Sequence, residues 1–124
     1  MRKLKVDGNK TNPSIDFDGY KGVLEITGRS IPENSIEFYK SLIDWASKYA
    51  IEPLPVTTVN IKLEYCNSFS RKFLLELLKT LKPIIKTNQT LNINWFYDQD
   101  DEDFKYEGEI FSNLTGLKIN TVIN

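Results

Sequence analysis

Residues 57–81 read TTVNIKLEYCNSFSRKFLLELLKTL, and their hydrophobic periodicity changes once, near Asn67. Residues 57–65 alternate apolar and polar side chains, a pattern typical of a strand with one face in water. Apolar residues then recur at helical spacing from Phe73 to Leu81, and Pro83 is expected to end that helix. A strand that leads directly into an amphipathic helix is the repeating unit of α/β folds.

The same alternation extends to both sides of this stretch. An early hairpin is expected, because Asp18-Gly19 and Gly22 suit a tight connection between two short alternating segments. The expected order is strand 14–17, strand 22–27, helix 31–50, strand 57–65, a helix that follows the junction and stops at Pro83, strand 90–97, helix 104–114 and strand 116–123. We therefore predict one α/β domain over residues 1–124, with a mostly parallel sheet, an N-terminal hairpin and helices chiefly on one face.

The composition excludes several classes of function. The chain has no histidine and a single cysteine, Cys66, which removes the Ser-His-Asp and Cys-His systems and nearly all mixed zinc sites. Its 16 basic and 17 acidic residues nearly cancel, so no overall field attracts nucleic acid or an anionic membrane. We find no signal peptide and no apolar run near the roughly 20 residues of a membrane span. These features predict a cytoplasmic protein without a cofactor.

Two hydroxyls, Ser68 and Ser70, mark the junction between the central strand and the next helix. One interpretation is helix capping, in which a hydroxyl accepts from a backbone N–H two or three residues on. The other is a phosphorylation site, because a helix N-terminus offers unpaired N–H groups and a positive dipole end. Arg71 and Lys72 follow at once and could pair with a phosphate.

Three further candidates have simpler alternatives. Carboxylates in the run Asp98–Asp103 could hold a magnesium ion, or could simply begin a solvated helix. Cys66 could be reactive beside a helix N-terminus, or a small buried hydrophobic residue. A glycosidase pair would have to come from Glu33, Glu37 and Glu64, and no spacing singles out two of them.

Three motifs resemble the SiaC family of bacterial regulatory phosphoproteins: PENS (32–35), LEYCNSFS (63–70) and NWFYDQDDE (94–102). The resemblance implies a fold like the STAS domains of anti-sigma-factor antagonists and a protein that is not an enzyme. It implies phosphorylation of a junction hydroxyl by a protein serine/threonine kinase and removal of the phosphate by a protein phosphatase. The unphosphorylated form would bind and activate a diguanylate cyclase, raising cyclic di-GMP and favouring biofilm formation.

Ser68 occupies the phosphoacceptor position of the family pattern, which is roughly Tyr-x-Asn-Thr-Ser-Ser and here spans residues 65–70. Ser70 is then the expected helix cap and the fallback acceptor, while Phe69 replaces a small hydroxyl residue. The resemblance further implies partner-binding residues, for which we take Asn67, Phe69, Arg71, Glu33 and Asn34. Two other functions remain open: an antagonist that sequesters an anti-sigma factor, and a small metal-dependent enzyme using the carboxylates of Asp98–Asp103.

Overall fold

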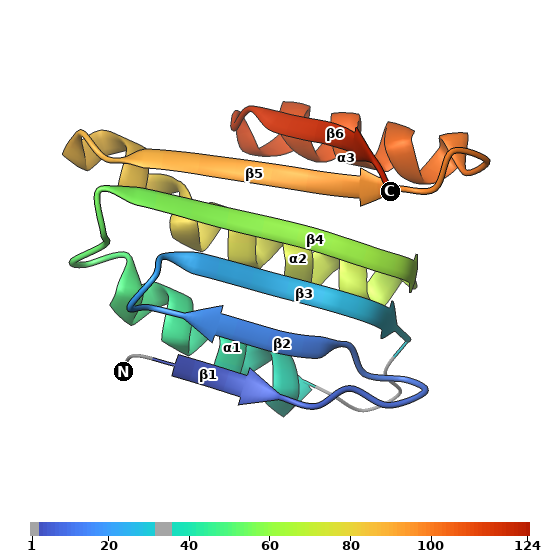
Figure 1. Ribbon diagram of the computed structural model, residues 1–124, viewed down its shortest axis with the longest axis horizontal. Helices are drawn as coiled ribbons and strands as arrows, with labels where there is room; N and C mark the ends of the chain where they lie inside the picture. The colour runs from blue at the N-terminus through green and yellow to red at the C-terminus, as the bar shows by residue number, and fades with distance from the viewer. Residues whose placement is uncertain (1–2, 32–35) are drawn as a thin grey trace.

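The computed structural model describes residues 3–31 and 36–124 of the 124-residue chain (Figure 1). The strands are β1 (Lys3–Val6), β2 (Ser14–Asp18), β3 (Val23–Ser30), β4 (Val56–Cys66), β5 (Thr90–Tyr97) and β6 (Ile119–Ile123). The helices are α1 (Ile36–Tyr49), α2 (Ser68–Leu81) and α3 (Glu102–Thr115), with a 3-10 helix, η1 (Lys82–Thr87), directly after α2.

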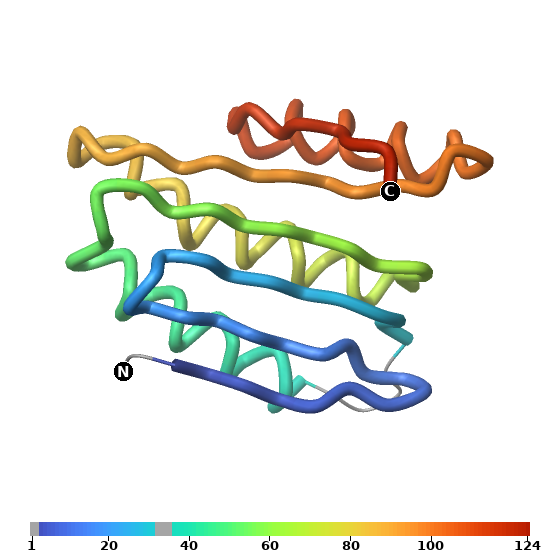
Figure 2. The backbone as a smooth tube through the Cα atoms, viewed as in Figure 1, coloured from blue at the N-terminus to red at the C-terminus, as the bar shows by residue number. Residues whose placement is uncertain are grey.

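The strands form one sheet in chain order, with β1 and β6 at opposite edges (Figure 2). The β1–β2 and β2–β3 pairs are antiparallel, and β3, β4, β5 and β6 run parallel to one another. The predicted hairpin and mostly parallel sheet are therefore confirmed. The chain between each two neighbouring parallel strands contains a helix, which is the usual way to bring the chain back to the end of the sheet where the next strand starts.

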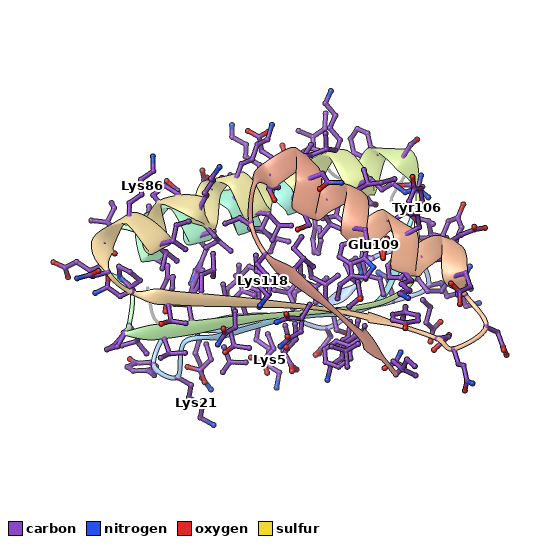
Figure 3. All side chains as sticks on the ribbon, turned by 90° about the horizontal axis from the view of Figure 1, so that it is seen from above. Lys5, Lys21, Lys86, Tyr106, Glu109 and Lys118 are labelled. Carbon is purple, nitrogen blue, oxygen red and sulfur yellow. The ribbon has the colours of Figure 1, made fainter. Side chains whose placement is uncertain are left out.

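All three α-helices cover the same face of the sheet (Figure 3). The core lies between these two layers and includes the fully buried side chains Phe17, Leu24, Leu42, Ile61, Leu78, Ile93 and Trp95. On the other face a row of amides crosses the sheet, where Asn60 donates to Glu25 (3.1 Å) and Asn94 donates to Asn60 (2.9 Å). This hydrated face is the one that the alternation in 57–65 and 90–97 predicts.

Two local features differ from the sequence-based expectation. Strand β1 was not expected, because Lys3–Val6 is short and half of its residues are lysine; it pairs with β2 at the sheet edge. The 3-10 helix η1 was not expected either: α2 ends at Leu81, before Pro83 as predicted, and Pro83 then stands at the start of η1, where its missing N–H is not needed. Among the described residues, none of the helices is long and apolar enough to cross a bilayer.

Candidate functional site

The junction between β4 and α2 places Ser68 at the first position of a helix, with its side chain exposed. Asn67 precedes it in an extended conformation, and its side-chain oxygen accepts from the N–H of Ser70 at 2.8 Å. Asn67 is therefore the N-cap, and the expectation that Ser70 caps the helix is wrong. The correction follows from where the backbone becomes helical: it does so at Ser68, one residue after the asparagine.

Ser70 is a fully buried member of a hydroxyl cluster that joins three elements. Its hydroxyl donates to the backbone oxygen of Ser30 in β3 (2.8 Å) and accepts from the Ser30 hydroxyl (2.7 Å). The Tyr39 hydroxyl of α1 contacts the Ser30 hydroxyl and lies 3.4 Å from that of Ser70. Burial raises the pKa of Tyr39 to about 12, so the phenol stays protonated at neutral pH and contributes its O–H to the cluster.

Replacing Ser70 by alanine should lower the free energy of unfolding by about 1 to 2 kcal/mol, because the buried Ser30 groups lose a partner. Urea denaturation measures this difference. Ser41→Ala is the matched control, since Ser41 is an exposed helical serine whose hydroxyl donates to a backbone oxygen of its own helix. The control should change stability by less than about 0.5 kcal/mol. Equal stability of the two variants would contradict a structural role for the cluster.

A bulge just before the junction decides which side chains face the solvent. Gly28 pairs with Leu63 and Arg29 with Tyr65, so Glu64 is an extra residue on β4. The alternation therefore shifts by one residue, and Tyr65, which was predicted to face the core, is 50% exposed. Tyr65, Ser68 and Phe69 consequently lie exposed close together along the chain at this end of the sheet.

The same bulge turns Cys66 inward. Its side chain is buried, and burial raises the pKa of the thiol to about 12. Arg71 acts in the opposite direction and does not offset the burial. The thiol is therefore protonated at neutral pH, which confirms the buried hydrophobic interpretation and leaves little thiolate for nucleophilic chemistry.

Arg71 forms an ion pair with Glu107 of α3. The pair ties the beginning of α2 to the neighbouring helix. Arg71 was expected to be available to pair with a phosphate on Ser68. Its guanidinium is instead already paired with the carboxylate of Glu107. Lys72, one residue on, is exposed and is the freer of the two cations for a group at Ser68.

Phe69 is 37% exposed and packs edge-on against Phe73, with 5.1 Å between ring centroids. Phe73 in turn stacks on Tyr39 of α1 at 4.9 Å. The residue after Ser68 is therefore the outermost ring of an aromatic stack that rests on the buried hydroxyl cluster.

The acidic residues 98–103 lie at the start of α3, and one of them caps this helix. Asp101 is the N-cap, and its carboxylate accepts from the N–H of Phe104 at 3.0 Å. Asp98 accepts from the side chain of Asn124 at 3.3 Å. Across residues 3–31 and 36–124, no cluster of three carboxylate, thiol or imidazole side chains is placed to hold a metal ion. These contacts favour the solvated helix start over the magnesium site.

Two of the predicted partner-binding residues, Glu33 and Asn34, lie outside the described residues, as does the rest of the PENS motif. Their roles stay predictions. The described members of the predicted set are Asn67, Phe69 and Arg71, and all three lie at the beginning of α2. Sequence reasoning missed Ser30 and Tyr39, which lie far from the junction along the chain and carry no local signal.

Known proteins match this chain over most of its length. The model of the SiaC family regulatory phosphoproteins matches residues 6–123. An uncharacterized protein of Pseudomonas aeruginosa (strain UCBPP-PA14) is 28% identical over 102 residues, which cover 82% of this chain and 81% of that protein.

Solved structures agree with this match. A chain in the crystal structure of the diguanylate cyclase SiaD in complex with its activator SiaC, from Pseudomonas aeruginosa, superposes with a TM-score of 0.89 at 25% identity. The alignment covers 98% of this chain and 99% of that one. The crystal structure of apo-SiaC from the same organism gives a TM-score of 0.86 at 25% identity, covering 100% of this chain and 99% of the other.

Proposed function

This chain belongs to the SiaC family of regulatory phosphoproteins, and from this premise we propose that it is a phosphorylation-controlled activator of a diguanylate cyclase. The unphosphorylated form binds and activates the cyclase, which raises cyclic di-GMP and favours biofilm formation. A protein serine/threonine kinase adds the phosphate and a protein phosphatase removes it. The protein acts in the cytoplasm and is not itself an enzyme. The similarity to SiaC bound to its cyclase supports this role, and we extend the proposal to a STAS-like fold.

The observation that carries the proposal is the contrast between the two junction hydroxyls. Ser68 is exposed at the first position of α2, whereas the hydroxyl of Ser70 is enclosed and donates to Ser30. A kinase must reach the oxygen that it modifies, so Ser68 is the phosphoacceptor. Modification of Ser70 would first require α2 to separate from β3.

The helix start favours a phosphate electrostatically. The first N–H groups of a helix have no partner within it, and the positive end of the helix dipole favours negative charge. Asn67 already binds the N–H of Ser70, which leaves the N–H groups of Ser68 and Phe69 at the surface beside the phosphate. The modification therefore changes the surface that a partner meets and leaves the core contacts of α2 in place.

A cyclase assay tests the proposal. Adding purified unphosphorylated protein to the diguanylate cyclase of the same organism, with GTP, should raise the rate of cyclic di-GMP formation until the cyclase is saturated. The cyclase alone is the control. An unchanged rate, together with no complex in size-exclusion chromatography, would contradict the proposal. If the chain instead formed a complex with an anti-sigma factor, the antagonist function would replace it.

A further inference from the structure

The edge of the sheet formed by β6 is open. Within the described residues β6 pairs with β5 and with no other strand, so the outer side of its backbone has no partner in the sheet. Figure 3 looks at the molecule from this edge, and β6 lies in front of the other strands there. An open edge presents a row of N–H and C=O groups to which a further strand can bond.

One hydrogen bond identifies which backbone groups point out of the sheet. The N–H of Asn124 donates to the backbone oxygen of Tyr97 in β5 at 2.8 Å. Since backbone groups alternate between the two sides of a strand, those of Asn120 and Val122 also point toward β5. The outward-pointing N–H and C=O groups are therefore those of Ile119, Thr121 and Ile123.

The two edges of the sheet differ in how they are protected. β1 carries exposed lysines, Lys3 and Lys5, and lysines on an edge strand oppose pairing with a further strand. β6 reads INTVI, with neither a charged residue nor a proline, and its Ile123 is 56% exposed. Of the two edges, β6 is the one suited to accept another strand.

We propose that β6 pairs antiparallel with β6 of a second copy of this chain, around a two-fold axis at Thr121. In this register Thr121 lies opposite Thr121 of the second copy, and Ile119 lies opposite Ile123. The outward backbone groups of all three residues then face one another, as in the hydrogen-bonded pairs of an antiparallel ladder. No other register pairs all three of them.

The side chains of β6 favour a second copy as the occupant. A Cβ on Gly108 would lie 3.2 Å from the methyl of Thr121, so Thr121 points toward α3, and Ile119 and Ile123 share this side by alternation. The pairing therefore places Ile119 of one copy beside Ile123 of the other and covers the exposed isoleucine. Because the order Ile, Thr, Ile is the same in both directions, β6 is complementary to itself, and opposed β-branched residues stabilise a sheet.

Charge and geometry limit the assembly to two copies. The net charge of the chain is −1, so two copies repel each other only weakly. The pairing uses both β6 edges and leaves a lysine-bearing β1 at each end of the joined sheet, which stops further growth. Ser68 follows β4, two strands away from this edge, so the start of α2 stays free. The inference is therefore independent of the proposed function.

Sedimentation equilibrium of the protein alone tests the proposal. β6 has five residues, and a pair of this length buries less than the roughly 800 Å² per partner of a standard interface. We therefore expect a weak dimer, with a dissociation constant of about 10 to 100 μM. The weight-average mass should rise from that of one chain toward that of two as the concentration increases from about 2 μM to about 1 mM.

A lysine on β6 should prevent the association. Ile123→Lys gives this edge the protection that β1 already has and should raise the dissociation constant at least about tenfold. Ile51→Lys is the matched control, because Ile51 is 76% exposed between α1 and β4 and receives the same side chain. The control should dimerise like the wild type, and the melting temperature of each variant shows whether it is folded.

Disulfide crosslinking tests the register. Residues 120 and 122 of the two copies would be opposite each other as a non-hydrogen-bonded pair, with Cα atoms about 4.5 Å apart, which a disulfide can bridge. A mixture of Asn120→Cys and Val122→Cys should form several-fold more covalent dimer under mild oxidation than either variant alone. The native cysteine, Cys66, is buried and does not contribute.

Three results would overturn the proposal. A wild type that stays monomeric at every concentration would exclude a second copy and leave the edge to a strand of another protein. Equal dimerisation of the wild type and a folded Ile123→Lys would place the contact elsewhere on the molecule. Crosslinking of either cysteine variant alone as readily as the mixture would exclude the two-fold register at Thr121. Since the cyclase is absent from all three experiments, failure of the proposed function would not change their outcome.

Discussion

Phosphorylation of Ser68 should abolish binding of the cyclase and leave the fold intact. A phosphate adds about −1.5 to −2 charges to the exposed start of α2, the surface that meets the cyclase under the proposed function. Burying such a charge without a matching cation costs several kcal/mol. Since each 1.4 kcal/mol is a factor of about ten in affinity, we expect the dissociation constant to rise at least a hundredfold.

Three forms of the protein test this result. Incubation with the kinase and ATP should add one phosphate to the wild type and none to Ser68→Ala, as read by intact mass. Ser68→Ala should then bind and activate the cyclase whether or not the kinase is present, and Ser68→Asp should bind weakly. A phosphate on Ser68→Ala would identify Ser70 or another acceptor. Equal affinity of the wild type and Ser68→Asp would argue against electrostatic exclusion.

The thermal stability of the phosphorylated protein separates a surface switch from an unfolding switch. Negative charge at a helix N-terminus typically stabilises by about 0.3 to 1 kcal/mol. Glu64 is exposed nearby, and its repulsion of a phosphate is well under 1 kcal/mol once salt screens it. The phosphorylated form should therefore melt within a few degrees of the unmodified form. A decrease of about 10 °C with loss of near-ultraviolet dichroism would mean that the phosphate unpacks α2.

Periodicity predicted the elements of this fold because its strands have one wet face and its helices one apolar stripe. The strand expected over 90–97 is β5 with the same bounds, since every second residue from Leu91 to Tyr97 is apolar. Strand β1 was missed because its alternation of lysine and apolar residues covers only four residues, too few to mark a strand. The end of α2 before Pro83 was predictable, because proline is excluded from the interior of an α-helix; η1 was not, because proline still suits a 3-10 turn.

The site was predictable only where its chemistry is local. The junction could be located from the change of periodicity, and the motif around Ser68 led to its prediction as the phosphoacceptor, which stays a prediction. The cap could not be assigned from residue types, because Asn67, Ser68 and Ser70 are all good capping residues. Tyr65 is exposed because β4 has a bulge before it. The bulge lies in the pairing with β3, where Tyr65 is opposite Arg29, a residue 36 positions before Tyr65. The hydroxyl cluster likewise joins residues separated by 31 and 40 positions.

Replacing Gly108 by valine should lower the free energy of unfolding by about 3 kcal/mol. Gly108 lies in the middle of α3, where glycine normally costs about 1 kcal/mol relative to alanine. The structure explains why it is nevertheless there. A Cβ at this position would lie 2.8 Å from Cγ and Cδ1 of Trp95, and 3.2 Å from a methyl of Thr121.

Trp95 cannot yield to such a side chain. Its indole is fully buried, donates a hydrogen bond to the backbone oxygen of Phe104 at 2.8 Å, and packs against the rings of Phe104 and Phe111. Valine would therefore force α3 away from β5 and β6, breaking these contacts together. The close approach also explains why the helical pattern of residues 104–114 is weak in the sequence: a glycine stands where a core residue would otherwise mark the buried face.

Thermal denaturation of Gly108→Val should show a melting temperature about 10 °C below the wild type, the shift that about 3 kcal/mol produces in a domain of this size. Glu109→Val is the matched control, because Glu109 is exposed on the same helix and receives the same β-branched side chain (Figure 3). Its effect should stay within about 0.5 kcal/mol, since the new side chain meets water. Gly108→Ala should fall between the two, because the gain of about 1 kcal/mol in helix propensity offsets part of the clash. Equal melting temperatures for Gly108→Val and Glu109→Val would mean that α3 has room against Trp95, and that this glycine is not what sets the separation between the helix and the sheet.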